Sequence, residues 1–335
     1  MSTLKIALVH DWIAGIAGDV RVLDALRAMY PDADVFCLSD GKPSRFRMPF
    51  MPVRAESLDL SDYDLVISTG SIFSKGLILR PKTHHINYCH SPTRQVWDLS
   101  HEYGHKIFQH FLRIWDRHAS TRVDTYVANS KHVQARIKKY YRREAEVIYP
   151  PVQIQNANIK NQNDSVKFKN YFFIISRLYK HKNIDIAIRA CNKLGWELVI
   201  VGEGPEHEYL KSIAGPTIHL LGYQSDQFCT LLFQFCTSFI MPQEEDFGIT
   251  GVEAMMHGKP VLALRRGGAL EYIKEGVSGL FFDDPHEAVL ADGLRRIKEM
   301  SFDPATIREH ASKFQWQNFQ SSFSNIITRI EHLRA

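Results

Sequence analysis

The sequence predicts an α/β protein composed of two doubly wound parallel sheets. Short β-branched runs alternate with amphipathic helical patterns over the first 150 residues, and the alternation resumes after residue 170. The 335 residues also exceed the ~100–200 residues that one hydrophobic core usually accommodates. With 44% hydrophobic and 23% charged residues, the composition excludes a disordered or collagen-like protein. We therefore expect two Rossmann-like domains that face a central cleft.

The first half contains five short apolar runs of the kind found in buried parallel strands. Their β-branched and aromatic residues favour an extended backbone, and amphipathic helical patterns separate them. The first run leads directly into Asp11 and lacks the small-residue cleavage site of a signal peptide, so it is interpreted as a strand. Strands are expected at residues 5–9, 35–38, 65–68, 85–89 and 125–128, with helices that include 19–30 and 131–141.

The second half repeats the succession of strand and helix. This repetition favours a second parallel sheet. Strands are expected at residues 172–175, 197–201, 218–220, 238–241 and 260–264, interleaved with helices near 184–193 and 251–257.

A linker is predicted between the halves. Pro150 and Pro151 precede an apolar-poor, asparagine-rich run at residues 153–167, which is typical of an inter-domain segment. We place the domains at residues 1–165 and 166–315. The remaining residues, 316–335, form a predicted helix that needs a partner surface, and the first domain is the candidate surface. Its apolar residues at helical spacing are Phe319, Phe323, Ile326, Ile327 and Ile330.

The compartment is predicted from cysteine usage and hydropathy. The five cysteines are scattered and contain no CxxC pair, which indicates neither a disulfide framework nor a cysteine zinc site. A reducing compartment fits this pattern. No apolar run approaches the ~18 residues of a membrane span. We expect a cytoplasmic protein, with any membrane contact peripheral.

The positive charge is concentrated in one part of the chain. Residues 101–200 contain 18 Lys and Arg against 8 Asp and Glu, whereas the remainder contains 23 against 29. The densest stretches, 106–117 and 138–143, are also aromatic. A solvated helix face or a core-facing aromatic stripe explains the segment 106–143, and a patch that docks on anionic lipid headgroups is the alternative. No nucleic-acid-binding fingerprint accompanies the charge, so no nucleic-acid partner is expected.

The strongest candidate site follows the strand at 238–241. Phe247, Gly248, Ile249 and Thr250 form a glycine-containing turn into a predicted helix. Backbone N–H groups from Gly248 to Thr250, with the helix dipole behind them, are suited to hold a diphosphate. Glu245 and Glu253 flank this turn and are candidates for binding sugar and ribose hydroxyls, with helix capping as the alternative for both.

Cationic residues follow the first strand of the same half, at residues 172–175. Arg177 can chelate phosphate oxygens bidentately and Lys182 can add a point charge, which suits a departing diphosphate. A solvated loop is the alternative. The next strand ends in Gly202, Glu203 and Gly204, where the glycines would let a ligand approach the backbone.

The first half offers weaker candidates. Gly15 and Gly18 lie in a loop between the first strand and a helix, and this loop lacks a full GxGxxG. His90 follows the fourth strand and is either a hydrogen-bond partner of a sugar hydroxyl or a structural histidine. Residues 101–105 fit the HExxH pattern of zinc peptidases, but Gly104 weakens the required helix.

Taken together, these segments resemble the retaining glycosyltransferases of family 4, which have the GT-B architecture. Glu245 and Glu253, with seven residues between them, are similar to the paired-glutamate motif of that family, and Arg177 and Lys182 stand upstream as expected. The resemblance covers nearly the whole chain. It is closest to bacterial mannosyltransferases of surface-polysaccharide assembly, through the stretches at residues 10–12, 88–92, 97–98 and 266–271.

The resemblance implies roles for the candidate residues. Arg177 and Lys182 would hold the donor diphosphate, Glu245 would contact the transferred sugar, Glu253 would bind the ribose, and His90 would face the sugar. Residues 1–165 would be the acceptor side and 166–315 the donor side. The donor would be a nucleotide sugar, with GDP-mannose as the expected donor, and the acceptor would be a lipid-linked saccharide. No cofactor or metal is expected, so the DxD-like residues 32–34 and 62–64 are interpreted as surface acids.

One departure from the family pattern concerns the first loop. Relatives carry Gly-Gly-Glu where this chain has Gly18-Asp19-Val20. An aspartate near a phosphate repels it unless the carboxylate points away or meets an arginine. The alternative function is therefore a catalytically impaired, sugar-nucleotide-binding subunit of a glycosyltransferase complex.

Overall fold

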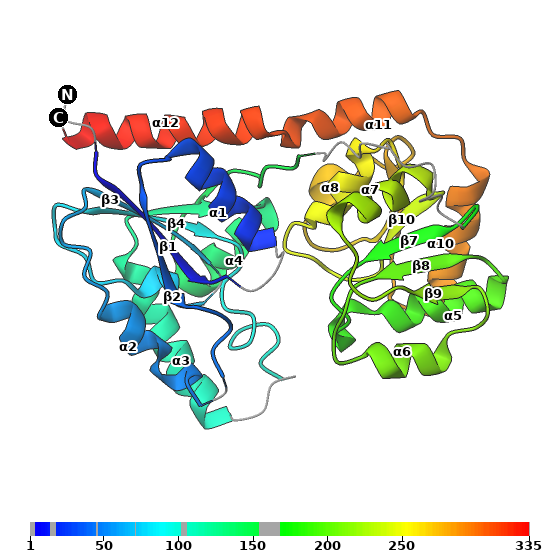
Figure 1. Cartoon of the computed structure of the whole chain (residues 1–335), viewed down its shortest axis with the longest axis horizontal. Helices are drawn as coiled ribbons and strands as arrows, with labels where there is room; N and C mark the ends of the chain where they lie inside the picture. Colours follow the sequence, from blue (N-terminus) through cyan, green and yellow to red (C-terminus); the bar gives the residue numbers. More distant parts are fainter. Residues whose placement is uncertain are drawn as a thin grey trace. The chain divides into compact units, whose positions relative to one another are not determined.

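The computed structural model describes residues 4–13, 18–44, 46–70, 72–101, 106–153 and 168–334. The chain divides into two compact units (Figure 1). The first unit comprises Met1–Pro151 and Trp316–Ala335, and the second comprises Val152–Gln315. The second unit thus begins at the start of the asparagine-rich segment. Among the described residues, no helix combines the length and apolar character that crossing a membrane requires.

The first unit is built on a six-stranded parallel sheet of order β2-β1-β3-β4-β5-β6. The chain starts at β1, forms β2 on one side and then returns to form β3 on the other. The switch point of this doubly wound sheet therefore lies between β1 and β3. The strands are β1 (Ile6–Trp12), β2 (Asp34–Ser39), β3 (Leu65–Gly70), β4 (His84–Cys89), β5 (Thr125–Ala128) and β6 (Glu146–Val147).

The helices of the first unit follow its strands. α4 shows how local sequence sets a boundary, because the Oγ atom of Ser130 caps its start by accepting from the backbone N–H of Val133 at 3.0 Å. Arg142 ends the helix in the left-handed conformation. The helical segments are α1 (Gly18–Met29), η1 (Met48–Phe50), α2 (Met51–Glu56), η2 (Ser74–Gly76), α3 (Lys106–Ala119), η3 (Ser120–Arg122) and α4 (Lys131–Tyr141).

The C-terminal helix α12 (Trp316–Arg334) belongs to the first unit. Its apolar side is buried in the same core as Leu8 of β1, Leu26 of α1 and Tyr88 of β4. The ring centroids of Tyr88 and Phe319 are 6.0 Å apart. The buried residues of this side are those at helical spacing in the sequence: Phe319, Phe323, Ile326, Ile327 and Ile330.

The second unit contains a six-stranded parallel sheet of order β12-β11-β10-β7-β8-β9. β7 begins the sheet, β8 and β9 follow on one side, and β10 to β12 follow on the other. Its switch point therefore lies between β7 and β10. The strands are β7 (Phe172–Ile175), β8 (Leu198–Val201), β9 (Ile218–Leu220), β10 (Ser238–Met241), β11 (Val261–Leu264) and β12 (Gly279–Phe282). The predicted fold class, two Rossmann-like parallel sheets, is confirmed.

The helices of the second unit cover this sheet. α5 buries Ile184, Ala187, Ile188 and Cys191, which recur at helical spacing and pack in the core with residues of the strands. The helical segments are η4 (Lys180–Lys182), α5 (Ile184–Leu194), α6 (His207–Ile213), α7 (Asp226–Phe235), α8 (Ile249–Met256), α9 (Ala269–Tyr272), α10 (Glu287–Glu299), α11 (Pro304–Ala311) and η5 (Ser312–Phe314).

Candidate active site

The switch point of the second unit brings two predicted residues into contact. β7 and β10 are neighbours in the sheet, so the segments that follow their carboxyl ends lie close together. Lys182, in η4 after β7, places its Nζ 2.5 Å from Oε1 of Glu245, in the loop between β10 and α8. Doubly wound sheets bind ligands at this position. The ion pair therefore marks the candidate site.

The surroundings of this pair fix the glutamate carboxylate. The side chain of Lys182 is 6% exposed and that of Glu245 is 24% exposed, so the lysine is buried and the carboxylate reaches the surface. Nε2 of Gln243 also donates to Oε1 of Glu245, at 2.9 Å. Two donors on one oxygen, one of them charged, hold the carboxylate in a defined orientation. Gln243 is buried and was not identified in the sequence analysis.

Asn183 links η4 to the loop after β10. It adopts the left-handed conformation with φ 53°, which asparagine tolerates better than most residues. Its Nδ2 donates to the carbonyl oxygen of Pro242 at 3.1 Å. Because Asn183 directly follows Lys182, this bond holds the lysine beside Glu245. Sequence reasoning missed Asn183, although an asparagine between a polar loop and a helix is a turn signal.

The start of α8 depends on a glycine. Gly248 precedes the helix with φ 91°, and a Cβ atom there would lie 2.8 Å from the hydroxyl of Tyr272. Ile249 and Thr250 then form the first helical positions, and Glu253 lies in the second turn, partly exposed. The N-terminus of α8 thus follows Glu245 closely in the chain, and the backbone N–H groups of such a helix end can bind an anion.

Buried aromatic rings support the loop between β10 and α8. Phe247 is buried against the rings of Tyr272 and Phe314, with centroids 5.6 and 5.5 Å away. The backbone N–H of Gly268 donates to the carbonyl oxygen of Glu245 at 2.9 Å. Burial raises the pKa of Tyr272 well above its usual value, and the Glu245 carboxylate raises it further. The Tyr272 hydroxyl is therefore protonated at neutral pH and supports the loop as a neutral group.

The segment after β7, which contains Arg177, packs closely against the glycine-containing segment after β8. Arg177 is exposed, with its guanidinium carbon 5.7 Å from the ring centroid of Tyr179. The N–H of Leu178 donates to the carbonyl of Glu203 at 2.8 Å. A Cβ atom at Gly202, which has φ 135°, would lie 1.9 Å from the carbonyl oxygen of Ser176. Gly202 is thus required by this close approach of two segments, and a ligand contact there stays a prediction.

At the switch point of the first unit, a buried carboxylate connects the segments that follow β1 and β3. Asp11, at the end of β1, is buried and accepts three backbone N–H groups of the segment after β3. Its Oδ2 accepts from Ile72 at 2.8 Å, and its Oδ1 accepts from Phe73 at 2.9 Å and Ser74 at 2.6 Å. A carboxylate with three such donors ties β1 to η2. The sequence analysis gave Asp11 no role. An aspartate at the end of an apolar run was the one sequence feature that pointed to it.

His90 is held by its neighbours after β4. Its Nε2 is 2.9 Å from Oγ1 of Thr69, and its ring centroid is 5.1 Å from that of Tyr88. Nδ2 of Asn129 donates to the His90 carbonyl at 3.0 Å. The side chain is partly exposed. These contacts orient the imidazole, and its proposed contact with a sugar stays a prediction.

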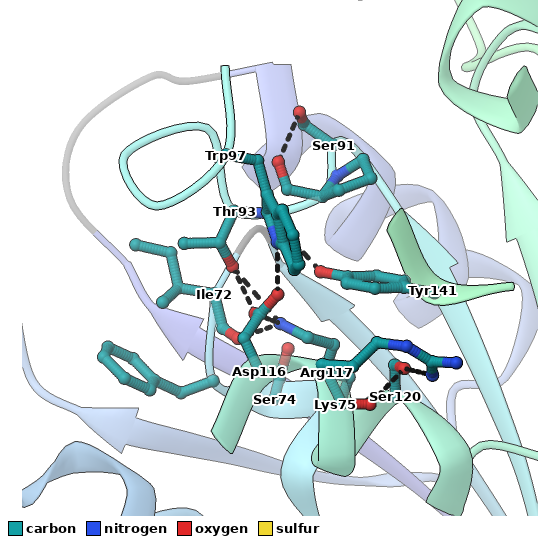
Figure 2. Close-up of polar contacts among 12 residues, drawn as sticks. Ile72, Ser74, Lys75, Ser91, Thr93, Trp97, Asp116, Arg117, Ser120 and Tyr141 are labelled. Atoms are coloured by element: carbon teal, nitrogen blue, oxygen red, sulfur yellow. Dashed lines mark hydrogen bonds and ion pairs between the residues drawn. The ribbon is translucent and has the colours of Figure 1, made fainter. Parts of the chain in front are cut away.

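A buried charged network lies under the segment after His90 (Figure 2). Lys75 of η2 and Asp116 of α3 are both buried, with Nζ 2.6 Å from Oδ1. Oγ1 of Thr93 donates to Oδ1 of Asp116 at 2.6 Å, and Nε1 of Trp97 donates to Oδ2 at 2.8 Å. Because Thr93 and Trp97 are both in this segment, the network fixes its path. Sequence reasoning did not identify it.

Some residues singled out in the sequence lie outside the described ranges, and others lie at the surface. Gly15 lies outside the described residues, as do residues 102–105 of the HExxH-like stretch. Gly18 begins α1, directly before Asp19. In the described ranges, His, Cys, Asp and Glu side chains do not gather in a group of three or more that could hold a metal ion. Asp32, Asp34 and Asp62 are exposed at the surface.

The fold defines the class of protein. Two doubly wound parallel units are the architecture of the GT-B glycosyltransferases. Residues 20–156 match the family model of Glycosyltransferase Family 4, and residues 155–314 match that of glycosyl transferases group 1. The chain belongs to the family 4 glycosyltransferases.

Individual relatives are distant. An uncharacterized glycosyltransferase of Methanocaldococcus jannaschii is 24% identical over 214 residues, which are 61% of this chain and 59% of that protein. The chain therefore spans less than two thirds of this relative's length. Alpha-1,3/1,6-mannosyltransferase ALG2 of Mus musculus is 23% identical over 331 residues, covering 86% of this chain and 78% of that protein.

Solved structures share the fold. Anabaena HepE in complex with UDP superposes with a TM-score of 0.74 at 17% identity, covering 97% of this chain and 100% of that one. Sucrose-phosphate synthase from Thermosynechococcus elongatus gives 0.73 at 14% identity, covering 99% and 100%. At these identities the likeness establishes the architecture of the chain.

Proposed function

We propose that the protein transfers a sugar, with retention of anomeric configuration, from a nucleotide sugar to a saccharide acceptor. The observation that carries the proposal is the contact between Lys182 and Glu245 at the switch point of the second unit. Family membership supports sugar transfer as the reaction class. The HepE structures, which contain UDP and in one case UDP with glucose, support a nucleotide sugar as the donor.

The donor occupies the second unit in this proposal. Lys182 and Arg177 hold the diphosphate, and the N-terminus of α8 adds the positive end of its dipole. An ammonium group has three donors, so Lys182 can keep its bond to Glu245 while it binds a phosphate oxygen. Glu245 then accepts from sugar hydroxyls, and Glu253 accepts from the ribose.

The chemical step depends on stabilising the leaving group. The bond between the anomeric carbon and the diphosphate oxygen breaks, and the acceptor oxygen bonds to the same face of that carbon. The acceptor proton passes to the departing phosphate oxygen. Negative charge therefore grows on the diphosphate, where Lys182, Arg177 and the helix dipole are already oriented. The proposal assigns this stabilisation to protein groups and requires no metal ion or cofactor.

The finer assignments concern substrates and location. We infer GDP-mannose as the donor and a lipid-linked saccharide of cell-surface polysaccharide assembly, such as lipopolysaccharide, as the acceptor. The ALG2 mannosyltransferases among the relatives support mannose as the sugar. A cytoplasmic protein that contacts the membrane peripherally through the basic segment 106–143 would reach such an acceptor.

Calorimetric titration tests the donor site. GDP, UDP and GDP-mannose are each titrated with and without a chelator. We expect GDP and GDP-mannose to bind more tightly than UDP, with affinities that the chelator does not change, because protein cations hold the diphosphate. Tighter binding of UDP would overturn the mannose assignment. Absence of binding by all three would contradict the proposed reaction, with Asp19 as the residue to replace next. Nucleotide binding without turnover would favour the impaired-subunit alternative.

A further inference from the structure

Helix α3 exposes an apolar stripe on the side that faces away from its own core. Ile107, Phe111 and Ile114 are 78%, 64% and 55% exposed. Their spacing of four and three residues places them on one face of a helix with 3.6 residues per turn. The buried residues of α3, which include Leu112 and Asp116, lie on the opposite face. Three large exposed apolar residues in one stripe indicate a surface that contacts something apolar.

Positive charge borders this stripe. By helical periodicity, Lys106, His110, Arg113 and Arg117 all fall on one flank of it. A shallow groove of about 560 Å³ on this flank is lined by four basic or titratable side chains together with Ile114 of the stripe and two further residues: His110, Arg113, Arg117 and His118, with Trp97 and Thr121. The single acidic residue of α3, Asp116, is buried against Lys75. The exposed flank of the helix is therefore cationic.

Helix α2 extends the surface. α2 and α3 lie side by side and share one hydrophobic core (Figure 1). Nε1 of Trp115 in α3 donates to Oε1 of Glu56 in α2 at 2.9 Å. Val53 of α2 is exposed on the side opposite to its buried residues, Met51 and Ala55. Both helices thus present apolar side chains away from their common core.

The other basic end of the segment 106–143 is engaged within the protein. Lys138 of α4 pairs with Glu144 at 2.9 Å. Arg143 donates to the backbone carbonyl oxygens of three residues, the shortest being 2.6 Å to Val123. On the flank of α3, Lys106, Arg113 and Arg117 also donate hydrogen bonds within the protein, to the carbonyl oxygens of Ser100 and Val96 and to Oγ of Ser120, but all three acceptors are neutral. The difference between the two ends is the carboxylate of Glu144, which compensates one charge at the end of α4.

We propose that the exposed face of α3, extended by α2, docks on an anionic lipid surface. An apolar stripe beside a cationic flank matches the boundary between acyl chains and acidic headgroups. The proposed lipid-linked acceptor explains why such contact would be useful, and in this respect the inference rests on the proposed function. Docking itself requires neither donor nor turnover, so the two proposals can fail separately.

Vesicle sedimentation of the full-length protein tests the apolar stripe. The probes are vesicles of equal parts phosphatidylglycerol and phosphatidylcholine, and vesicles of phosphatidylcholine alone. We expect the wild type to sediment with the anionic vesicles and to be released by high salt. The triple variant Ile107→Ser, Phe111→Ser and Ile114→Ser should bind at least about tenfold more weakly. Equal binding by this variant would overturn the proposal.

A matched control carries three exposed apolar residues of the second unit, Tyr223→Ser, Phe235→Ser and Met300→Ser. It should bind like the wild type. Equal loss in both triple variants would show a nonspecific effect of surface polarity and overturn the assignment to α3. Sedimentation velocity without lipid tests whether a second copy of the chain covers the α3 face instead. Dimers that form in the wild type and are lost in the α3 triple variant would also overturn the lipid-docking proposal.

The charge requirement has its own pair of variants. Lys106→Gln with Arg117→Gln removes two charges from the flank of α3, and Lys138→Gln with Lys139→Gln removes two from α4. We expect the first pair to weaken binding to anionic vesicles about tenfold and the second to change it less than about twofold. The reverse order would move the docking surface to α4 and contradict the proposal.

Discussion

Replacing Lys182 with alanine is expected to lower kcat by about 10²–10³-fold while changing the dissociation constant for the nucleotide far less. Charge accumulates on the diphosphate as its bond to the sugar breaks, so a buried cation at that position acts chiefly on the transition state. Steady-state kinetics of sugar transfer, combined with calorimetric titration of the nucleotide, separates the two effects.

Lys180 provides the matched control for this experiment. It lies in the same 3-10 segment, η4, is exposed, and differs from Lys182 in having its side chain outside the pair with Glu245. Lys180→Ala should retain kcat within about twofold of the wild type. Thermal melting of both variants shows whether they fold. Wild-type kcat in a folded Lys182→Ala variant would remove this lysine from the mechanism.

Replacing Asp116 with alanine is expected to destabilise the first unit by about 3–5 kcal/mol. The change leaves the Lys75 ammonium buried without its carboxylate, and it removes the acceptor of Thr93 and Trp97. Urea unfolding followed by tryptophan fluorescence measures the effect. Four of the five tryptophans belong to the first unit, so the signal reports mainly on that unit.

The control for this prediction is an exposed pair. Asp292 and Arg296, one turn apart on α10, are 3.0 Å from each other with both side chains well exposed. Asp292→Ala should cost about 1 kcal/mol or less. The double variant Lys75→Met with Asp116→Leu should recover part of the loss, because it leaves no buried charge. A loss in Asp116→Ala as small as that in Asp292→Ala would contradict the structural role of the network.

The fold class could be predicted because the strands of both sheets are buried and the helices are amphipathic. The predicted strand at 238–241 has the bounds of β10, and that at 260–264 differs from β11 by one residue. β6 was missed because it has only two residues, and β12 because four residues that begin with glycine form a weak pattern. Neighbouring strands, not their own sequences, place these two in the sheets.

The candidate site could be predicted only in part. Lys182 and Glu245 are charged residues in polar segments that follow apolar strands, which is a local signal. Their contact depends on the pairing of β7 with β10, which is a property of the strand order. Gln243 and Asn183 are neutral amides, so they add no charge pattern to the sequence. Tyr272 lies in α9, in a separate part of the sequence, and its ring supports the loop by packing against Phe247.

The buried network of the first unit was inaccessible to sequence reasoning for a related reason. Lys75 and Asp116 stand in separate segments, and Lys and Asp are most often exposed. Asp116 also lies within the basic stretch 106–117, whose charged residues suggest a solvent-exposed helix. Only the packing of η2 against α3 shows that both side chains are buried. Gly202 is the opposite case, because the sequence analysis assigned it to ligand binding. In the structure, the close approach of the Ser176 backbone already explains why a glycine is needed there.

Sugar release from the donor tests the central claim most directly, because water can take the place of the unidentified acceptor. The nucleotide sugar whose nucleotide binds most tightly is incubated with the enzyme, and proton NMR records the anomer of the freed sugar before mutarotation. We predict that the first anomer has the configuration of the donor and that Glu245→Gln slows its appearance. First release of the opposite anomer, or no release where the nucleotide binds, would contradict retaining transfer at this site.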